Sequence, residues 1–203
     1  QHSSESNEHS TPQHIADGAR QLMGGITLDP ASSKLANTII RAKRFYTKKE
    51  NGYLRPWKGN VFWNPPGGIC EFQTGREIIK STKDRAGCKV TGTCGLPPGP
   101  LHKHVQPTSS AKAWWFQGAK HYEAGLIRHG FFVGFTLEIL QSTQTEYPDG
   151  SRAAFIPAQF PYCIPNERLE FLVEDEDGKL QPGEEPTHAN VLVYLPFEWS
   201  KQE

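Results

Sequence analysis

The stretch that decides the fold is Asn60-Val61-Phe62-Trp63-Asn64-Pro65-Pro66-Gly67-Gly68. It begins with an apolar run typical of a buried strand, and the run ends directly in a polar, proline-rich corner. Consecutive prolines fix the backbone and remove two N–H donors, so the corner is rigid and presents carbonyl oxygens. Because ligands of open α/β sheets bind beyond the carboxyl ends of the strands, we interpret this corner as a candidate site.

A second corner of this kind precedes the first. The residues Ile26-Thr27-Leu28 predict a short strand that ends at Asp29-Pro30, with Ala31 and Ser32 after it. A carboxylate that leaves a buried strand can accept hydrogen bonds from a ribose or an ammonium group, and small residues after it let a nucleoside approach the backbone. An ordinary turn is the alternative interpretation of Asp29-Pro30.

Predicted helices and strands alternate around these two corners. The helices are expected over 12–23, 31–42, 110–124 and 137–142, and the strands over 26–28, 44–46, 60–63, 130–135, 153–163, 168–173 and 190–196. The last two strands flank an acidic, turn-rich stretch and are expected to form a C-terminal antiparallel hairpin. The alternation favours an α/β fold, a Rossmann-like sheet with helices on both faces.

The chain has 203 residues, which fits one domain. We expect a disordered tail over 1–10 and a single domain over 11–203, with a basic, Gly- and Pro-rich insertion at about 69–110. A mean hydropathy of -0.60 and the lack of a long apolar run argue against a membrane span. No signal-like segment opens the sequence, so we expect a cytoplasmic protein.

Charge is unevenly distributed in a chain of zero net charge. Residues 38–112 hold 14 Lys and Arg against 4 Asp and Glu, a net +10, whereas residues 113–203 hold 6 against 14, a net -8. A basic segment that also carries most of the motifs is what a surface facing a polyanion needs. The alternative is a solvated face whose charges interleave with the acidic half.

The insertion also contains a possible metal site. Zinc binds four-coordinate sets of thiolates and imidazoles, and the candidate ligands are Cys88, Cys94, His102 and His104. A structural zinc would order a loop with few apolar residues, although surface thiols and histidines in a disordered loop explain the same pattern. Cys70 is an alternate ligand, and Cys163, inside an apolar stretch, is expected in the core.

The corner after Trp63 has a specific chemical use. The side-chain oxygen of Asn64 beside the Pro65 carbonyl offers two acceptors aimed at one point, which is what an exocyclic amino group requires. Accepting both N–H bonds pulls the nitrogen out of conjugation and directs its lone pair at an electrophile. Such chemistry requires no His or Cys nucleophile.

Taken together, the motifs resemble the phage-type DNA N-6-adenine methyltransferase family. The resemblance is carried by Ser10-Thr11-Pro12, Gly25-Ile26-Thr27-Leu28-Asp29-Pro30-Ala31-Ser32, Arg44-Phe45-Tyr46-Thr47 with Asn51-Gly52, and Val61-Phe62-Trp63-Asn64-Pro65-Pro66. It covers residues 10 to 68 well and continues less tightly through 114–116, 132–135, 161–171 and 186–190. The resemblance implies a methyltransferase sheet and S-adenosylmethionine as cofactor.

It also implies residue roles. The catalytic loop would be Asn64, Pro65, Pro66 and Gly67, with Asn64 and the Pro65 carbonyl holding the target amine. The cofactor site would comprise Thr11, Pro12, Asp29, Pro30, Ala31, Ser32 and Asn64, together with Glu50 or Asn51. Thr11 and Pro12 would lie near the methionine end, and Glu50 or Asn51 stands where relatives often carry an acidic residue.

Gly67 departs from the family pattern, because relatives place there an aromatic ring that stacks on the extruded base. Base–aromatic stacking contributes ~1–3 kcal/mol, so another ring must substitute or the substrate differs. Trp63 is adjacent but is a candidate core residue. Trp114 and Trp115 point in different directions on a helix, so one is expected in the core and the other free to stack. Phe155 is a further candidate.

The leading hypothesis is a site-specific methyltransferase that acts on the exocyclic amine of adenine in double-stranded DNA after base extrusion. The expected setting is a bacterium or a phage-infected host cell, in restriction-modification or a related role. One alternative is methylation of amine or amide groups of protein or RNA. Another is a DNA-binding relative whose catalysis is disabled by Gly67.

Overall fold

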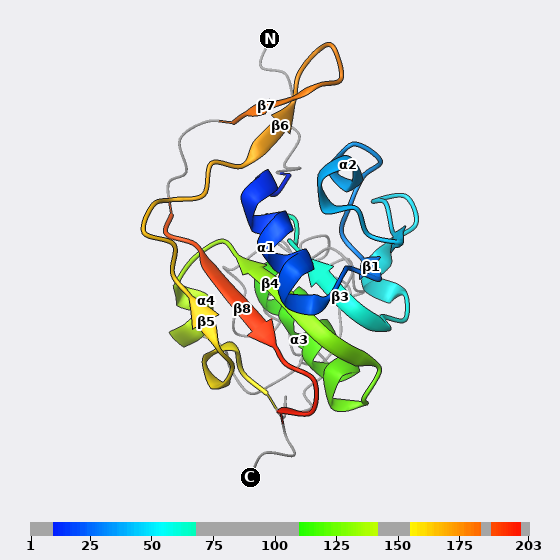
Figure 1. The fold of residues 1–203 in the computed structure, drawn as a ribbon, viewed down its shortest axis with the longest axis vertical. Helices are drawn as coiled ribbons and strands as arrows, with labels where there is room; N and C mark the ends of the chain where they lie inside the picture. Colours follow the sequence, from blue (N-terminus) through cyan, green and yellow to red (C-terminus); the bar gives the residue numbers. More distant parts are fainter. Residues whose placement is uncertain (1–9, 68–109, 142–154, 184–187, 200–203) are drawn as a thin grey trace, which may run out of the picture.

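The computed structural model describes residues 10–67, 110–141, 155–183 and 188–199 (Figure 1). Its centre is a six-stranded sheet in the order β2-β1-β3-β4-β8-β5. These strands are β1 (Leu28–Asp29), β2 (Arg44–Phe45), β3 (Gly59–Trp63), β4 (Ile127–Gly134), β5 (Tyr162–Cys163) and β8 (Val191–Leu195). β2, β1, β3 and β4 run parallel, and β8 runs antiparallel to β4 and β5. The predicted α/β class is confirmed.

Helices cover both faces of this sheet. α1 (Gln13–Met23) and α2 (Ala36–Ile40) pack on one face, and α3 (Ser110–Glu123) packs on the other with the short α4 (Glu138–Gln141). Successive side chains of a strand point to opposite faces, so Phe62 packs with α1 whereas Val61 and Trp63 pack with α3. Figure 1 shows α1 and α3 on opposite sides of the sheet.

α1 follows its predicted course. Pro12 occupies the N-cap position, where its missing N–H costs nothing. Gly24 ends the helix with a φ of 67°, and the N–H of Gly25 donates to the carbonyl of Arg20 at 2.8 Å. A glycine adopts this left-handed conformation without the strain of a Cβ, so the chain turns sharply into β1.

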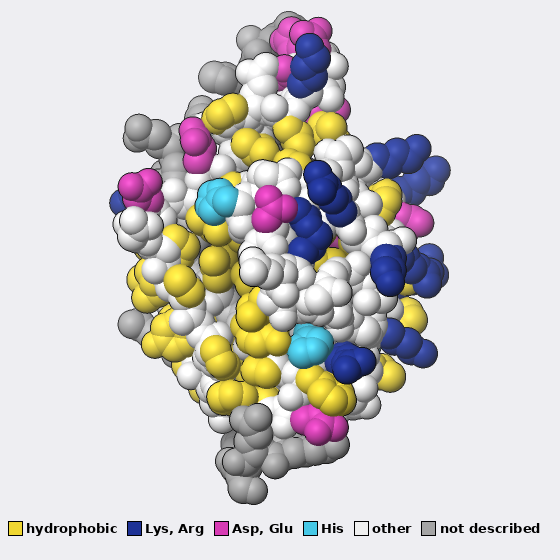
Figure 2. Space-filling view, viewed as in Figure 1, with side chains coloured by type: hydrophobic (Ala, Val, Ile, Leu, Met, Phe, Trp, Pro, Cys, Tyr) yellow, Lys and Arg dark blue, Asp and Glu magenta, His cyan; other side chains and the backbone are white. Residues whose placement is uncertain are grey.

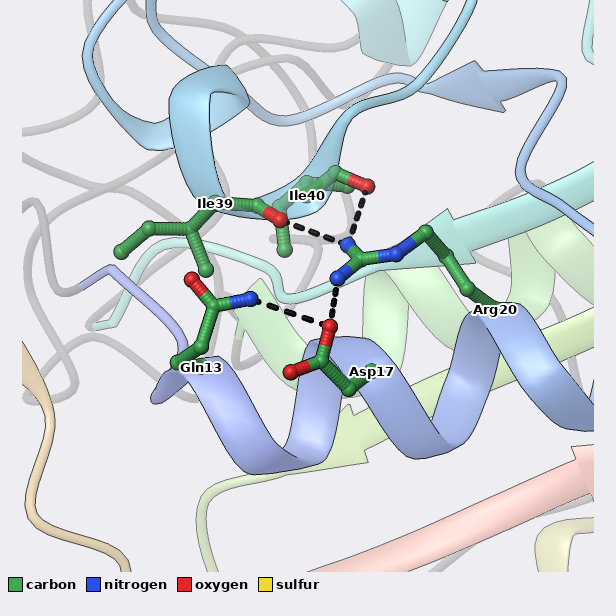
Figure 3. A network of polar contacts seen from close by, with 5 residues as sticks. All are labelled: Gln13, Asp17, Arg20, Ile39 and Ile40. Atoms are coloured by element: carbon green, nitrogen blue, oxygen red, sulfur yellow. Dashed lines mark hydrogen bonds and ion pairs between the residues drawn. The ribbon is translucent and has the colours of Figure 1, made fainter.

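Arg20 joins α1 to α2 (Figure 3). Its Nη1 donates to the carbonyls of Ile39 and Ile40 at 2.6 and 2.9 Å, the last carbonyls of α2. Asp17 pairs with the same guanidinium and accepts from Gln13 at 3.1 Å. A cation at a helix C-terminus satisfies orphan carbonyls and the helix dipole, so the network holds α2 against the helix that begins beside the candidate site.

The tryptophans of α3 correct one prediction. Both Trp114 and Trp115 are buried, although one was expected to be free. Trp114 packs on Tyr53 and Trp57, with ring centroids at 5.4 and 5.6 Å, so the segment before β3 buries it in the same core cluster as Trp115. Trp63 is fully buried and belongs to the core.

The antiparallel hairpin forms from other strands than those predicted. β6 (Leu172–Glu174) pairs with β7 (Leu180–Pro182), so the acidic stretch is itself part of a separate two-stranded sheet. β8, expected to pair with the strand over 168–173, lies between β4 and β5 instead. Asp175 closes the hairpin by accepting from the backbone N–H groups of Asp177 and Lys179.

Other expectations need smaller corrections. The helix predicted over 31–42 is confined to α2, and the described part of the stretch expected as a strand over 153–163 is a 3₁₀ turn at Pro157–Gln159 followed by β5. Cys163 is exposed on this edge strand rather than in the core. Ser10, assigned to the tail, pairs with Leu172. No helix within the described ranges combines the length and apolar character needed to cross a bilayer.

Candidate active site

The two predicted corners lie at adjacent strand ends. From β1 the chain moves to β2 on one side of β1 and then returns to β3 on the other side. Such a reversal of strand order is the place where open α/β sheets bind ligands, beyond the carboxyl ends of the strands. Asp29 ends β1 and Asn64 follows β3, so the fold brings both residues to this switch point.

The corner after β1 holds a buried carboxyl group. Asp29 is only 2% exposed, and its Oδ1 accepts from the Ala31 N–H at 3.0 Å. Burial raises the pKa of Asp29 to about 7, against the opposing effects of the Ala31 N–H and the nearby Ser32 hydroxyl. This carboxyl group is therefore poised between its two protonation states at neutral pH, which makes it a functional-site candidate.

Neighbouring segments close this corner tightly. The carbonyl of Asp29 accepts from Tyr46 N–H, and the carbonyl of Tyr46 accepts from Ser32 N–H, both at 2.9 Å. A Cβ on Gly52 would lie 1.9 Å from the Pro30 carbonyl oxygen, so only glycine fits at this contact. The Asn51-Gly52 turn therefore packs directly on the Asp29-Pro30 corner.

Two polar atoms near this corner are buried without a full complement of hydrogen bonds. Within the described ranges, Asn51 Oδ1 has no hydrogen-bond partner. Ser32 Oγ lies close enough to Asp29 to affect its pKa, but among the described residues it makes no hydrogen bond with both a normal length and a normal angle. Asn51 also adopts a left-handed conformation, with a φ of 52°. Buried polar atoms of this kind are uncommon and call for a partner such as a ligand. Together with Asp29 they form a set of acceptors suited to hydroxyl or ammonium groups.

Glu50 lies differently from the other candidates. Its side chain is exposed, and Oε2 accepts from the N–H and the hydroxyl of Thr47, both at 2.9 Å. These hydrogen bonds lower the pKa of Glu50. Its carboxylate thus stabilises the turn that leads from β2 to Asn51, and of the two alternatives Asn51 is the one with a buried side-chain oxygen.

The corner after β3 presents an amide in a fixed position. Asn64 is half-buried, and its Nδ2 donates to Thr11 Oγ1 at 3.2 Å. Pro65 is buried and Pro66 is exposed, so the corner emerges from the core between these two residues. The hydrogen bond connects two motifs that are 53 residues apart, because Thr11 lies directly before α1.

Asn190, for which the sequence predicted no role, lies at the same edge of the sheet. It is 3% exposed; its Nδ2 donates to the carbonyls of Gly134 and Phe135, and its Oδ1 accepts from Leu169 N–H. It therefore ties the end of β4 to the segment before β6. An asparagine immediately before a buried strand is the signal that marks it, because a buried amide requires several partners.

One side of the molecule is strongly basic. The exposed basic side chains between α1 and β3 are Lys34, Arg41, Lys43, Arg44, Lys48, Lys49, Arg55 and Lys58. We call this set the basic surface; over the same stretch the only acidic side chain besides the buried Asp29 is Glu50. Figure 2 shows Lys and Arg side chains gathered on the side where α2 and β1 lie in Figure 1.

The predicted zinc ligands Cys88, Cys94, His102 and His104 lie outside the described residues, as does most of the insertion at about 69–110. In the part of the chain that the structure describes, no group of three or more His, Cys, Asp or Glu side chains is arranged to hold a metal ion. A Cβ added at Gly67, the last described residue before the insertion, would meet no other described residue within 4 Å.

Comparisons of this chain with models of protein families, with curated proteins and with solved structures return no match. The geometry of the two corners and the chemistry of their side chains are therefore what indicates a function.

Proposed function

We propose that this protein transfers a methyl group from S-adenosylmethionine to the exocyclic amino group of adenine in DNA. The observation that carries the proposal is the placement of Asp29 and Asn64 at one switch point of the sheet. The corner after β1 offers a buried carboxyl group that is partly ionised at neutral pH. The corner after β3 offers a neutral amide in a fixed position. The resemblance of the motifs to the adenine methyltransferase family supports the same assignment.

The corner after β1 fits this cofactor. A ribose diol and an α-ammonium group need acceptors, and the corner supplies the Asp29 carboxylate, Ser32 Oγ and Asn51 Oδ1. Ionised Asp29 would also complement a cationic ligand, which offsets the cost of burying the carboxylate. S-adenosylmethionine, when bound, supplies an electrophilic methyl group.

The corner after β3 fits the amine. Asn64 Oδ1 and the Pro65 carbonyl would accept the two N–H bonds of an exocyclic amino group and direct its lone pair away from the ring. Hydrogen-bond acceptors fixed in advance cost no reorganisation when charge develops on the nitrogen. As the bond from the nitrogen to the methyl carbon formed, the bond from that carbon to the cofactor sulfur would break and leave a neutral thioether. The nitrogen would become cationic and would then lose a proton to water, so the chemistry requires no strong base.

The basic surface supports a polyanionic substrate. Lys48 and Lys49 follow β2 and lie on the turn that leads to Asn51, next to the corner after β1. Lysine and arginine contacts to phosphates position a nucleic acid without specifying its sequence. DNA held by this surface would lie beside the switch point.

A second candidate follows from the aromatic residues. Trp63, Trp114 and Trp115 are all buried, so three of the four rings considered as replacements at Gly67 pack in the core. Only Phe155 among them is half-buried. A small amide or amine group of a protein needs no stacking ring, which favours a protein methyltransferase as the alternative.

Methyl transfer from labelled S-adenosylmethionine to duplex DNA, RNA and protein, measured in parallel, tests the proposal. We expect label in DNA, and nucleoside mass spectrometry should find it as N6-methyladenine. Label in protein alone would support the second candidate, and cofactor binding without transfer to any substrate would contradict both. Asn64→Ala is the control that removes the proposed acceptor.

A further inference from the structure

The Thr11 hydroxyl is used in an unusual way. A threonine next to a helix start often accepts hydrogen bonds from N–H groups of the first turn. In this protein Pro12 is at the N-cap position, and among the described residues no side chain caps α1. The Thr11 oxygen instead accepts from Nδ2 of Asn64 at 3.2 Å.

The backbone around Thr11 is held firmly. Ser10 exchanges two hydrogen bonds with Leu172, its N–H donating at 2.7 Å and its carbonyl accepting at 2.9 Å. On the other side, the Pro12 carbonyl accepts from the N–H groups of Ile15 and Ala16 at 3.2 Å, which starts α1. Thr11 itself is only 2% exposed. The hydroxyl is therefore a fixed reference point beside the β3 corner.

The orientation of the Asn64 amide decides whether it can hold an amine. Oδ1 accepts hydrogen bonds, whereas Nδ2 carries two donors that would repel the N–H groups of the substrate. A rotation of the amide by half a turn exchanges the two atoms. Because the Thr11 hydroxyl accepts from Nδ2 in this structure, Oδ1 is the amide atom left to accept from a substrate.

We propose that Thr11 is a positioning residue for methyl transfer, whose hydroxyl holds the Asn64 amide with its oxygen facing the target amine. The inference rests on the proposed function of Asn64. It differs from the role that the family resemblance implies for Thr11, a contact with the methionine end of the cofactor. The two roles separate experimentally, because a positioning residue alters turnover and a cofactor contact alters cofactor affinity.

Two substitutions of Thr11 and one matched control test this. Thr11→Val keeps the shape of the side chain and removes the hydroxyl, whereas Thr11→Ser keeps the hydroxyl. Thr27→Val is the control, because Thr27 Oγ1 accepts a hydrogen bond of the same length, 3.2 Å, from the Asn60 N–H at the opposite end of β3. Each variant is compared in kcat, in KM for DNA and in the Kd for S-adenosylmethionine.

We expect Thr11→Val to lower kcat about ten- to a hundredfold, since small misplacements of a reacting group have effects of this size. Cofactor affinity should stay unchanged, Thr11→Ser should retain most of the activity, and Thr27→Val should leave kcat unchanged. Wild-type turnover in Thr11→Val overturns the inference. A parallel loss of cofactor affinity also overturns it and assigns Thr11 to the cofactor site.

A second measurement keeps the inference testable if the wild-type protein transfers no methyl group and the proposed function fails. The Nδ2 protons of Asn64 can be identified in ¹⁵N spectra by their loss in Asn64→Asp. We expect slower hydrogen exchange of these protons in the wild type and Thr11→Ser than in Thr11→Val. Equal exchange in the three proteins would show that the hydroxyl does not hold the amide.

Discussion

The corners after β1 and β3 share an apolar strand, a polar residue and a proline, yet they differ in charge. The first buries the ionisable carboxyl group of Asp29, whose pKa is raised to about 7 by loss of water. The second presents the neutral amide of Asn64, held by Thr11. A buried carboxyl group lowers stability when it is ionised, whereas a hydrogen-bonded amide costs little.

This difference indicates that the two corners bind different ligands. An energetically costly carboxylate is useful where a ligand brings positive charge or several hydroxyl donors, because these partners replace the lost water. A neutral amide is suited to an uncharged amine, because its oxygen accepts an N–H bond without burying a second charge. The corner after β1, which holds Asp29 and is called the charged corner below, therefore fits the cofactor. The corner after β3, which holds Asn64 and is called the neutral corner, fits the substrate. Four predictions test this comparison.

The largest effect is expected at the charged corner. The pKa of Asp29 is 3.8 in its ordinary state and about 7 in the folded protein. The folded state thus binds more protons than the unfolded state between these values, and the free energy of unfolding falls as pH rises from about 4 to about 7. Asp29→Asn keeps the Oδ1 acceptor and should be more stable than the wild type above pH 7, by up to about 4 kcal/mol. Urea unfolding across this pH range measures it.

Cofactor affinity is a further readout for Asp29→Asn. Cofactor affinity should fall roughly tenfold or more, since hydrogen bonds to charged groups contribute about 1.5–3 kcal/mol. Asp175→Asn is the matched control for the stability measurement. Hydrogen bonding from the Lys179 N–H lowers the pKa of Asp175, so ionisation of this group makes the free energy of unfolding rise with pH instead of fall. A stability difference between Asp29→Asn and the wild type that is constant with pH would contradict the buried, ionisable corner.

The neutral corner is tested by Asn64→Ala. Loss of one fixed acceptor should lower the transfer rate about a hundred- to a thousandfold and leave cofactor affinity largely intact. Asn60→Ala is the control on the same strand, because Asn60 donates to the carbonyls of Met23 and Gly25 at the opposite end of β3. Asn60→Ala should lower stability without changing turnover per folded molecule. Near-normal turnover in Asn64→Ala would remove the second corner from the reaction.

Local sequence patterns predicted both corners, because each depends on residues that are adjacent in the chain. An apolar run followed by Asp-Pro or Asn-Pro-Pro identifies a strand end, and proline fixes the backbone there. The meeting of the corners followed from fold class, since neighbouring parallel strands share a carboxyl edge. The hydrogen bond between Thr11 and Asn64 has no local signature, because it joins residues that only the fold brings together.

The predictions that were wrong have the same physical origin, because they too concern contacts between residues that are distant in the chain. Alternation of apolar residues predicted β8 but carries no information on its partner, and β8 pairs with β4 rather than within a terminal hairpin. Trp114 packs on Tyr53 and Trp57, which belong to a segment more than 50 residues earlier. Trp115 packs on Trp63 and Phe132 of the sheet. An edge strand can expose Cys163 in an apolar sequence, because one of its edges has no neighbouring strand.

A smaller effect is expected where the Asn51-Gly52 turn supports the charged corner. The Cβ of Gly52→Ala would lie 1.9 Å from the Pro30 carbonyl oxygen, so the turn and the corner must separate. Such overpacking costs about 1–3 kcal/mol, and cofactor affinity should fall with it. Gly18→Ala is the control: no described residue outside the helix backbone lies within 4 Å of the added Cβ, and alanine in a helix should stabilise the protein by about 0.5–1 kcal/mol. Unchanged cofactor affinity in Gly52→Ala would mean that the turn does not shape the site.

The smallest effect is expected on the basic surface, whose Lys48 and Lys49 lie on the turn next to the charged corner. Lys48→Gln with Lys49→Gln should weaken binding to duplex DNA at low salt and reduce the slope of log affinity against log salt by up to about 2, since each phosphate contact contributes about 0.9. The sequence that is methylated should not change, because phosphate contacts carry no base information. Lys179→Gln, in the acidic hairpin, is the control and should leave the slope unchanged. Fluorescence anisotropy across a salt series measures all three proteins. A flat salt response of the wild type would contradict a polyanionic substrate and direct the search to a protein amide, which the neutral corner could hold equally well.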